Sequence, residues 1–282
     1  MPEYKNNHTI PGFLLQQWES YALGRYGVYQ YDLGHKKINF ASSRKKGRFS
    51  FASKNYFYVP LVKNERQTVV EKWLSDMEGL LSTVVKKLNE GTEDLLVRDR
   101  DEADKLLMGL FSLRHRTESA INSIRKFIED HPEVKLQMNV SEDRDIHLIV
   151  LENMIHATRE NAIDYRNYKI TVFRSDSEQF IIGDQPFLGD VMNNGSHFVV
   201  LSPKFCISIQ KNPENAYFSY MDTTPEILNL FNRSVAGHAR KWIVAKDRLF
   251  LEKYLPTADE PKQDDTPLLE IPKYILNADR IA

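Results

Sequence analysis

The most regular pattern of hydrophobic positions lies in the middle third of the chain. Apolar side chains recur there at steps of three and four residues, which places them along one face of a helix of about five or six turns. These positions are Val69, Val70, Trp73, Met77, Leu80, Leu81, Val84 and Leu88. Weaker patterns predict a second helix over 103–129 and a third over 146–162. His131-Pro132 separates these two helices, because proline cannot continue a helix.

The first 64 residues show alternation between apolar and polar positions. A short helix is predicted over 11–21, with Pro11 near its first turn, where the missing N–H does no harm. Strands are predicted over 28–32 and 55–59, which are rich in aromatic and β-branched residues, and a turn is predicted over 33–36.

Short apolar runs separated by polar turns predict strands after residue 166. The runs 169–174 and 179–183 flank a polar segment at 175–178, which indicates a hairpin. Two further strands are predicted over 198–201 and 205–210.

The chain ends in a predicted helix and a polar tail. The helix covers 224–245, with Thr224 as its N-cap and Pro225 in its first turn. The segment from 256 to 272 is rich in Pro and Asp, so we expect it to lie on the surface as a strap.

These elements predict an α+β fold. A central helical region is flanked by N- and C-terminal strands, which we expect to pair into one mixed sheet. With neither an internal repeat nor a low-complexity linker, residues 1–282 are expected to form a single compact domain. Its parts are a strand and loop region (1–64), a helical region (65–165), a strand region with a late helix (166–255) and a tail (256–282).

Charge and cysteine content narrow the classes of function. The chain has 38 Lys and Arg residues against 39 Asp and Glu residues, so no global field draws it to nucleic acid or to an anionic membrane. The single cysteine, Cys206, can form neither an internal disulfide nor a multi-cysteine zinc site, which indicates a reducing compartment, the cytoplasm. The N-terminus lacks an apolar signal region, and no stretch approaches the roughly 20 apolar residues of a spanning helix.

Three short strings resemble a known family when they are taken together. They are Asn7-His8-x-x-Pro11, Phe180-Ile181-Ile182-Gly183-Asp184-Gln185-Pro186 and Leu201-Ser202-Pro203. Their order and spacing resemble the uncharacterised bacterial family known as domain of unknown function 4238. The chain departs from the family pattern at three places: Gly183 stands for Ser, Gln185 stands for Asn, and Arg116-Thr117-Glu118 lacks the usual Pro after Arg-Thr. The resemblance implies a shared fold and a shared site but no established activity.

The best candidate catalytic set is His8, Glu78, Arg116 and Asp184. A histidine can move a proton near neutral pH, a carboxylate can orient it or hold Mg²⁺ or Mn²⁺, and an arginine can clamp a phosphate. Asp184 ends a strand in a Gly-Asp-x-Pro turn, which can present a side chain to a cleft. These residue types suit phosphodiester hydrolysis. The structural alternative is that Asp184 caps its own backbone and that His8 anchors the N-terminus.

A local basic stretch is the candidate contact with nucleic acid. It mixes cations that can pair with phosphates and aromatic rings on which bases can stack. The cations are Arg44, Lys45, Lys46, Arg48 and Lys54, and the rings are Phe49, Phe51 and Tyr56. A solvated basic loop is the alternative interpretation.

Two weaker patterns carry other hypotheses. Arg233 and His238 are spaced as in the HEPN ribonuclease superfamily, although Ser234 stands where that superfamily usually has Asn, Asp or His. Glu152, His156 and Glu160 share one helical face and could hold a divalent metal or form a solvated stripe.

The sequence therefore predicts a nuclease-like hydrolase acting on RNA or DNA, such as a toxin or a phage-defence component. Nucleotide-binding glycine loops, zinc-protease motifs and the esterase elbow have no match in the chain. The rival hypothesis is a non-catalytic module that binds a ligand or a protein. Assembly with a second copy or with a partner protein is compatible with both.

Overall fold

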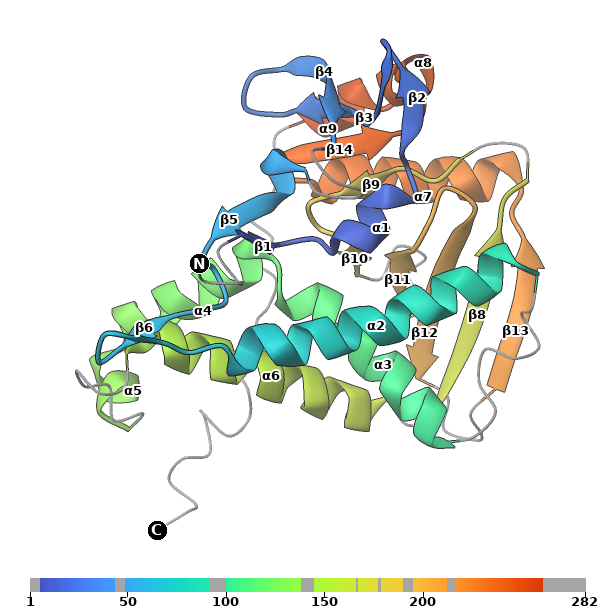
Figure 1. The fold of residues 1–282 in the computed structure, drawn as a ribbon. Coiled ribbons are helices and arrows are strands. Elements are labelled where there is room, and N and C mark those ends of the chain that lie inside the picture. The colour runs from blue at the N-terminus through green and yellow to red at the C-terminus, as the bar shows by residue number, and fades with distance from the viewer. Residues whose placement is uncertain are drawn as a thin grey trace.

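The computed structural model describes most of the chain, and the regions it describes contain two five-stranded sheets and a group of helices (Figure 1). The described residues are 6–43, 49–91, 100–137, 145–165, 167–176, 179–189, 195–211 and 217–260. The α+β class is confirmed. The expectation of one mixed sheet is wrong, because the strands divide among several sheets.

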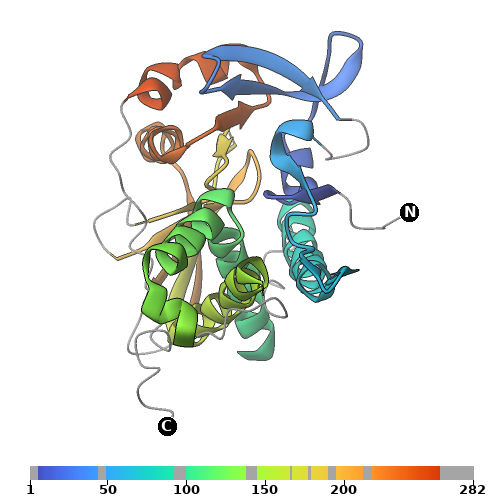
Figure 2. The same cartoon turned by 90° about the vertical axis from the view of Figure 1, so that its left-hand side faces the viewer.

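The first sheet joins the two ends of the described chain. Its strands are β2 (Ser20–Ala22), β3 (Arg25–Asp32), β4 (Lys37–Ser42), β9 (Ile182–Gly183) and β14 (Trp242–Ala245). β14 lies between β3 and β9 and is antiparallel to both. N- and C-terminal strands thus do pair here, as Figure 2 shows where the blue and red segments meet.

The second sheet is built only from the C-terminal half. Its order is β10 (Phe187–Leu188), β11 (His197–Val200), β12 (Phe205–Lys211), β8 (Tyr168–Arg174) and β13 (Tyr217–Asp222). β13 is parallel to β8, and the other neighbours are antiparallel. The ring of Phe231 packs against Phe173, Phe180 and Phe198, so helix α7 (Pro225–His238) covers one face of this sheet.

The predicted hairpin around 175–178 is wrong, because its two strands belong to different sheets. β8 pairs with β12 and β13, whereas β9 pairs with β14. The apolar run Phe180, Ile181 and Ile182 is fully buried, and it carries the chain from one sheet to the other. Burial of this run against both layers overrides the local turn signal.

Five described helices lie between the N-terminal strands and the second sheet in the sequence. They are α2 (Val69–Asn89), α3 (Arg100–His115), α4 (Glu118–Asp130), α5 (Pro132–Gln137) and α6 (Ile146–Asp164). The predicted helix α2 is confirmed. Most of its apolar stripe is buried, including Val70, Met77, Leu81 and Leu88, whereas Val69 is exposed. The helix predicted over 103–129 is instead two helices, because Thr117 adopts an extended conformation and its hydroxyl caps α4 by accepting from the Ala120 N–H.

Two other predicted elements are shorter than expected. The N-terminal helix α1 covers only Gly12–Gln16, and 20–22 form β2 instead. The strand β5 (Ser53–Asn55) ends where the prediction began, because Tyr56 takes a left-handed backbone conformation with φ of 54°. β5 pairs with β1 (Asn6–His8), and 3₁₀ helix η1 (Ser50–Ala52) precedes it.

The late helix is the remaining correction. Thr224 caps α7 and Pro225 opens it, as predicted, but the helix ends at His238. The run Trp242–Ala245 is fully buried as β14, because a short apolar run with β-branched residues fits the centre of a sheet. Two short helices follow, α8 (Arg248–Glu252) and α9 (Leu255–Asp259). The predicted surface strap is therefore wrong for 256–259, which belong to α9 with Ala258 buried in the core, and the rest of the predicted tail, beyond 260, lies outside the described residues.

The remaining described strands are β6 (Leu61–Val62) and β7 (Glu65–Arg66), which pair with each other. Within the described part of the chain, no helix has both the length and the apolar character that crossing a bilayer requires.

Candidate functional site

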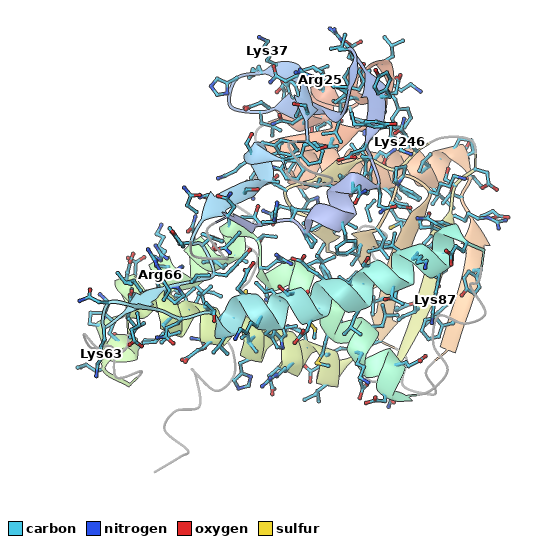
Figure 3. The ribbon with its side chains drawn as sticks, viewed as in Figure 1. Arg25, Lys37, Lys63, Arg66, Lys87 and Lys246 are labelled. Carbon is cyan, nitrogen blue, oxygen red and sulfur yellow. The ribbon has the colours of Figure 1, made fainter. Side chains whose placement is uncertain are left out.

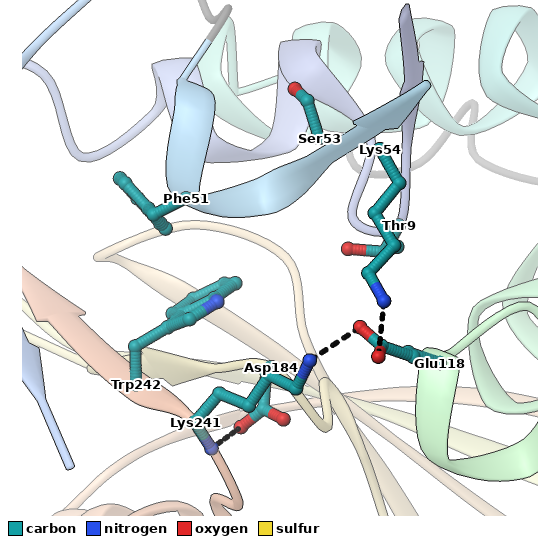
Figure 4. A pocket seen from close by; sticks show the side chains of 8 residues that line it. All are labelled: Thr9, Phe51, Ser53, Lys54, Glu118, Asp184, Lys241 and Trp242. Carbon is teal, nitrogen blue, oxygen red and sulfur yellow. Dashed lines mark hydrogen bonds and ion pairs between the residues drawn. The ribbon is translucent and has the colours of Figure 1, made fainter. Parts of the chain in front are cut away.

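A small pocket lies where the opening strand, the start of α4 and the start of β14 meet (Figure 4). Its volume is about 50 Å³, which is room for a small polar group. The residues that line it come from three regions of the chain. They are Thr9, Phe51, Ser53, Lys54, Glu118, Asp184, Lys241 and Trp242.

Asp184 reaches this pocket from the turn between β9 and β10. Its Oδ1 accepts hydrogen bonds from the backbone N–H groups of Arg240, at 2.8 Å, and Lys241, at 3.1 Å. Desolvation raises the pKa of Asp184, and the backbone hydrogen bonds only partly oppose that rise. One carboxylate oxygen therefore caps the approach to β14, while Oδ2 accepts from the side-chain amide of Gln185 at 3.5 Å.

Glu118 joins two cations in the same pocket. Its carboxylate forms ion pairs with Lys241, at 2.5 Å from Nζ to Oε2, and with Lys54 through Oε1. Figure 4 shows both ammonium groups directed at this one carboxylate. Burial would raise the pKa of Glu118, but hydrogen bonds from Lys241 and Lys54 outweigh burial and lower it.

Phe51 and Trp242 form the aromatic wall of the pocket. Their rings meet edge to face with centroids 4.9 Å apart. Trp242 is 3% exposed, so its ring belongs mainly to the core and Phe51 offers the more accessible face.

Arg116, two residues before Glu118, is buried, with 1% of its side chain exposed. Its guanidinium donates to Glu78 Oε1 at 2.7 Å and to the backbone carbonyl of His8 at 2.6 Å. Burial alone would lower the pKa of Arg116, but Glu78 and Tyr58 raise it above its ordinary value. Arg116 therefore ties the end of α3 to α2 and to β1.

Asn7, the first residue of the Asn7-His8-x-x-Pro11 string, belongs to the same buried cluster as Arg116. Asn7 is fully buried, and its Oδ1 accepts from the Tyr58 N–H at 3.0 Å. The Tyr58 hydroxyl in turn donates to the Arg116 carbonyl at 2.6 Å, and burial raises the pKa of Tyr58 to about 12. Glu71 completes the cluster, where burial first and then the nearby Glu78 raise its pKa.

The four predicted catalytic residues thus fall into two adjoining groups. Glu78, Arg116 and the backbone of His8 form the buried ion-pair cluster. Asp184 lies in the pocket. The two groups are neighbours along the chain, since Thr9 follows His8 and Glu118 comes two residues after Arg116, and both line the pocket.

A family model described as Protein of unknown function (DUF4238) matches residues 6–248. The chain belongs to this family. The match includes every residue that lines the pocket and both halves of the buried cluster. No curated protein and no solved structure matches the chain. The family assignment confirms the resemblance drawn from the three strings and adds no activity to it.

Only part of the predicted basic contact can be placed. Arg44, Lys45, Lys46 and Arg48 lie outside the described residues. Lys54 lines the pocket of this DUF4238 member, and its ammonium also lies 5.4 Å from the ring centroid of Phe57.

The predicted rings near the basic stretch have different environments. Phe49 is 1% exposed and therefore belongs to the core, whereas Phe51 lines the pocket. The Tyr56 ring has the guanidinium of Arg66 at 3.9 Å.

Basic side chains elsewhere in the described part of the chain are spread out. In Figure 3 the labelled Arg25, Lys37 and Lys246 lie near the first sheet, Lys63 and Arg66 lie at β6 and β7, and Lys87 lies near the end of α2. The labelled cations therefore come from several separate parts of the fold.

The predicted metal row lies on α6. His156 Nδ1 is 3.8 Å from Glu160 Oε1, and Glu152 and Glu160 are exposed. Among the residues that the structure describes, no three His, Cys, Asp or Glu side chains come together as a metal-binding group.

Arg233 and His238 are both exposed on α7. A separation of five residues turns their side chains about 140° apart around the helix. The His238 ring contacts the Ser234 carbonyl one turn earlier, at 2.8 Å from Nδ1.

Sequence reasoning missed Glu118 and Lys241 as members of the site. Glu118 directly follows the Arg116-Thr117 pair. Recognising Thr117 as the N-cap of a new helix would have pointed to Glu118 as its first residue. Lys241 fell inside a predicted continuous helix, which hid the turn that presents it to the pocket.

Proposed function

We propose that the protein is a phosphodiester hydrolase acting on nucleic acid, RNA or DNA, with its reaction centre in the pocket of Asp184, Glu118, Lys54 and Lys241. The observation that supports this most is the meeting of two ammonium groups and a carboxyl with a raised pKa in one pocket. Ammonium groups bind phosphate oxygens, and a carboxyl with a raised pKa is suited to proton transfer.

Three of these side chains, Lys54, Lys241 and Asp184, have a definite role in the proposed reaction. Lys54 and Lys241 bind the phosphate oxygens and stabilise the charge that develops on them. Asp184 takes a proton from the attacking water through Oδ2 as the new oxygen–phosphorus bond forms. The bond to the leaving oxygen breaks, and Asp184 returns the proton to that oxygen. The products are a phosphate monoester and an alcohol.

The buried cluster positions the site in this proposal. Arg116 and Glu78 hold the carbonyl of His8 and so fix the strand that leads into Thr9. His8 stays the second candidate for proton transfer, as the sequence predicted; it directly precedes Thr9 but is not among the residues that line the pocket. The sealed position of Arg116 favours this positioning role over direct contact with a phosphate.

Arg44, Lys45, Lys46 and Arg48 continue the proposed contact from Lys54 in the pocket to the strand beyond the scissile phosphate. A divalent cation, Mg²⁺ or Mn²⁺, would bind the phosphate together with the pocket carboxylates. The setting we propose is the cytoplasm, in a toxin or phage-defence component, in keeping with a single cysteine that is buried in the structure.

Cleavage of labelled single-stranded RNA and DNA, with and without Mg²⁺ or Mn²⁺, tests the proposal. The informative variant is Asp184→Asn, because its side-chain carbonyl can still accept from the Arg240 and Lys241 N–H groups while its amide cannot take a proton. We expect the cleavage rate to fall at least about 100-fold. The matched control is Asp76→Asn on the exposed side of α2, which should cleave like the parent protein. A parent protein that cleaves neither substrate under any of these conditions would reject the proposal.

The alternative is a non-catalytic module that binds a ligand or a second protein chain. It is favoured by one specific observation: Asp184 and Arg116 both satisfy backbone groups, as residues with a purely structural role do. Strand binding and cleavage separate the two. A binding module holds a labelled oligonucleotide or a partner chain without cleaving RNA or DNA, whereas the hydrolase loses cleavage in Asp184→Asn although both backbone hydrogen bonds are kept.

A further inference from the structure

The carboxylate of Glu118 resembles the phosphodiester group that the pocket is proposed to bind. A carboxylate carries one negative charge shared by two oxygens, and so does the phosphodiester group of a nucleic acid. In the pocket, each carboxylate oxygen pairs with a different lysine, Oε1 with Lys54 and Oε2 with Lys241. Two non-bridging phosphate oxygens could pair with the same two ammonium groups in the same way.

The position of Glu118 also suits an anion that arrives from outside. Glu118 is the first residue of α4, a helix of 13 residues whose N-terminal N–H groups favour negative charge. The ion pairs are only partly buried, with side-chain exposures of 17% for Glu118, 42% for Lys54 and 50% for Lys241. Ion pairs this exposed are weak and exchange easily.

The lysines keep Glu118 ionised, because they lower its pKa despite its burial. Mild acidification therefore does not release the two cations. A competing anion can release them, since it offers each ammonium group an equivalent partner.

We propose that Glu118 occupies the anion subsite of the pocket in the free protein, and that a phosphate group of a nucleic acid strand displaces it from Lys54 and Lys241. This inference rests on the proposed function, because it assigns the regulation of the same site. The free protein is then self-blocked, and only a strand that binds well enough to move Glu118 reaches Asp184.

Binding measurements with the intact chain test this inference. Fluorescence anisotropy with a short labelled single-stranded oligonucleotide measures the strand, and calorimetry measures inorganic phosphate. Glu118→Gln removes the charge and keeps the shape, so we expect the strand to bind about tenfold more tightly, which corresponds to the loss of two competing partly exposed ion pairs. Glu129→Gln, an exposed carboxylate near the other end of α4, is the matched control and should leave the affinity unchanged.

Three results would overturn the inference. If Glu118→Gln binds the strand equally or more weakly, Glu118 serves only to hold the lysines in place. If Lys54→Met and Lys241→Met bind the strand as tightly as the parent, the lysines are not its subsite. If Glu118→Gln tightens binding of inorganic phosphate alone, the subsite takes free phosphate rather than a strand.

Failure of the proposed function gives a different result. In that case Glu118→Gln still tightens binding of the strand, but neither it nor the parent protein cleaves. The anion subsite would then belong to a binding module.

Discussion

Arg116 shows how one buried side chain can organise a site that it does not line. Its guanidinium bridges the carboxylate of Glu78 and the carbonyl of His8, and its own carbonyl accepts from Tyr58. A charge in this position is stable only because these partners replace water. The same residue would be a poor phosphate clamp, since 1% exposure leaves little surface for an incoming ligand.

Loss of this bridge should cost the protein much of its stability. Arg116→Met keeps the volume but leaves Glu78 and the His8 carbonyl without their donor. We expect the free energy of unfolding to fall by about 3 kcal/mol. Denaturation with urea measures the change.

Arg248→Met is the control for this substitution. Arg248 forms an ion pair with Glu252 on the exposed face of α8, and its loss should cost about 0.5 kcal/mol or less. Equal losses in the two variants would mean that burial of the Arg116 pair contributes nothing.

For individual residues, the sequence predicted which side chains lie near one another but not their roles. It named Glu78, Arg116 and His8 together, and the structure joins the first two by an ion pair and Arg116 to the backbone of His8. It could not predict that Arg116 is fully buried while Glu118 is partly exposed. These residues are only two positions apart, and the difference in their burial comes from the tertiary packing around the Thr117 cap.

Among the elements, the contact between α2 and α3 depends on a glycine. A Cβ atom at Gly109 of α3 would lie 3.0 Å from Cγ of Leu81, which is buried in α2. Gly79 of α2 is exposed, and a Cβ there would meet no described atom within 4 Å. A Gly→Ala substitution would therefore meet a packed side chain at Gly109 and open space at Gly79.

We expect opposite signs for Gly79→Ala and Gly109→Ala. Alanine favours the helix over glycine by about 1 kcal/mol, so Gly79→Ala should stabilise the protein by roughly that amount. Gly109→Ala should destabilise it by about 1 kcal/mol, because overpacking against Leu81 costs more than the helix gains. Thermal melting of both variants measures the difference, and a stabilised Gly109→Ala would show that Leu81 can move aside.

The length of an element decided whether the sequence could predict it. The stripe of α2 extends over many turns, so its period identifies it without knowledge of its neighbours. The run Trp242–Ala245 is too short to show a period, and only its neighbours β3 and β9 make it a strand. The pairing of β8 with β12 rather than β9 is likewise a tertiary choice.

Across the whole molecule, the pocket is the junction of three regions that are distant in sequence. Thr9 and Lys54 come from the N-terminal region, Glu118 from the helices, and Asp184 and Lys241 from the C-terminal half. A site of this kind forms only when the complete fold forms. The sequence supported the expectation that His8 and Asp184 share one pocket, but the pocket contains Asp184 and Thr9, and His8 is not among its lining residues.

The pH dependence of stability is a property of the whole fold, and buried His115 should contribute to it between pH 6.5 and 5. Burial and the nearby Arg114 lower the pKa of His115 to about 3, and its Nε2 lies 2.8 Å from the amide of Asn161. In the unfolded chain His115 takes up a proton below about pH 6.5, whereas in the folded chain it does not. Stability should therefore fall as the pH decreases through this interval.

His115→Gln isolates this contribution. We expect the parent protein to lose about 2 kcal/mol more than the variant between pH 6.5 and 5, at about 1.4 kcal/mol per pH unit. Urea denaturation at several pH values measures both curves. Parallel curves would mean that His115 gains its proton in the folded protein as readily as in the unfolded chain.

The most direct test of the proposed reaction centre is the single-turnover rate at which Asp184→Asn cleaves a single-stranded oligonucleotide, relative to the parent protein. We expect a ratio of about 1 to 100 or lower, together with an unfolding free energy within about 1 kcal/mol of the parent value. A variant that stays folded and cleaves at the rate of the parent would contradict the assignment of Asp184 to proton transfer.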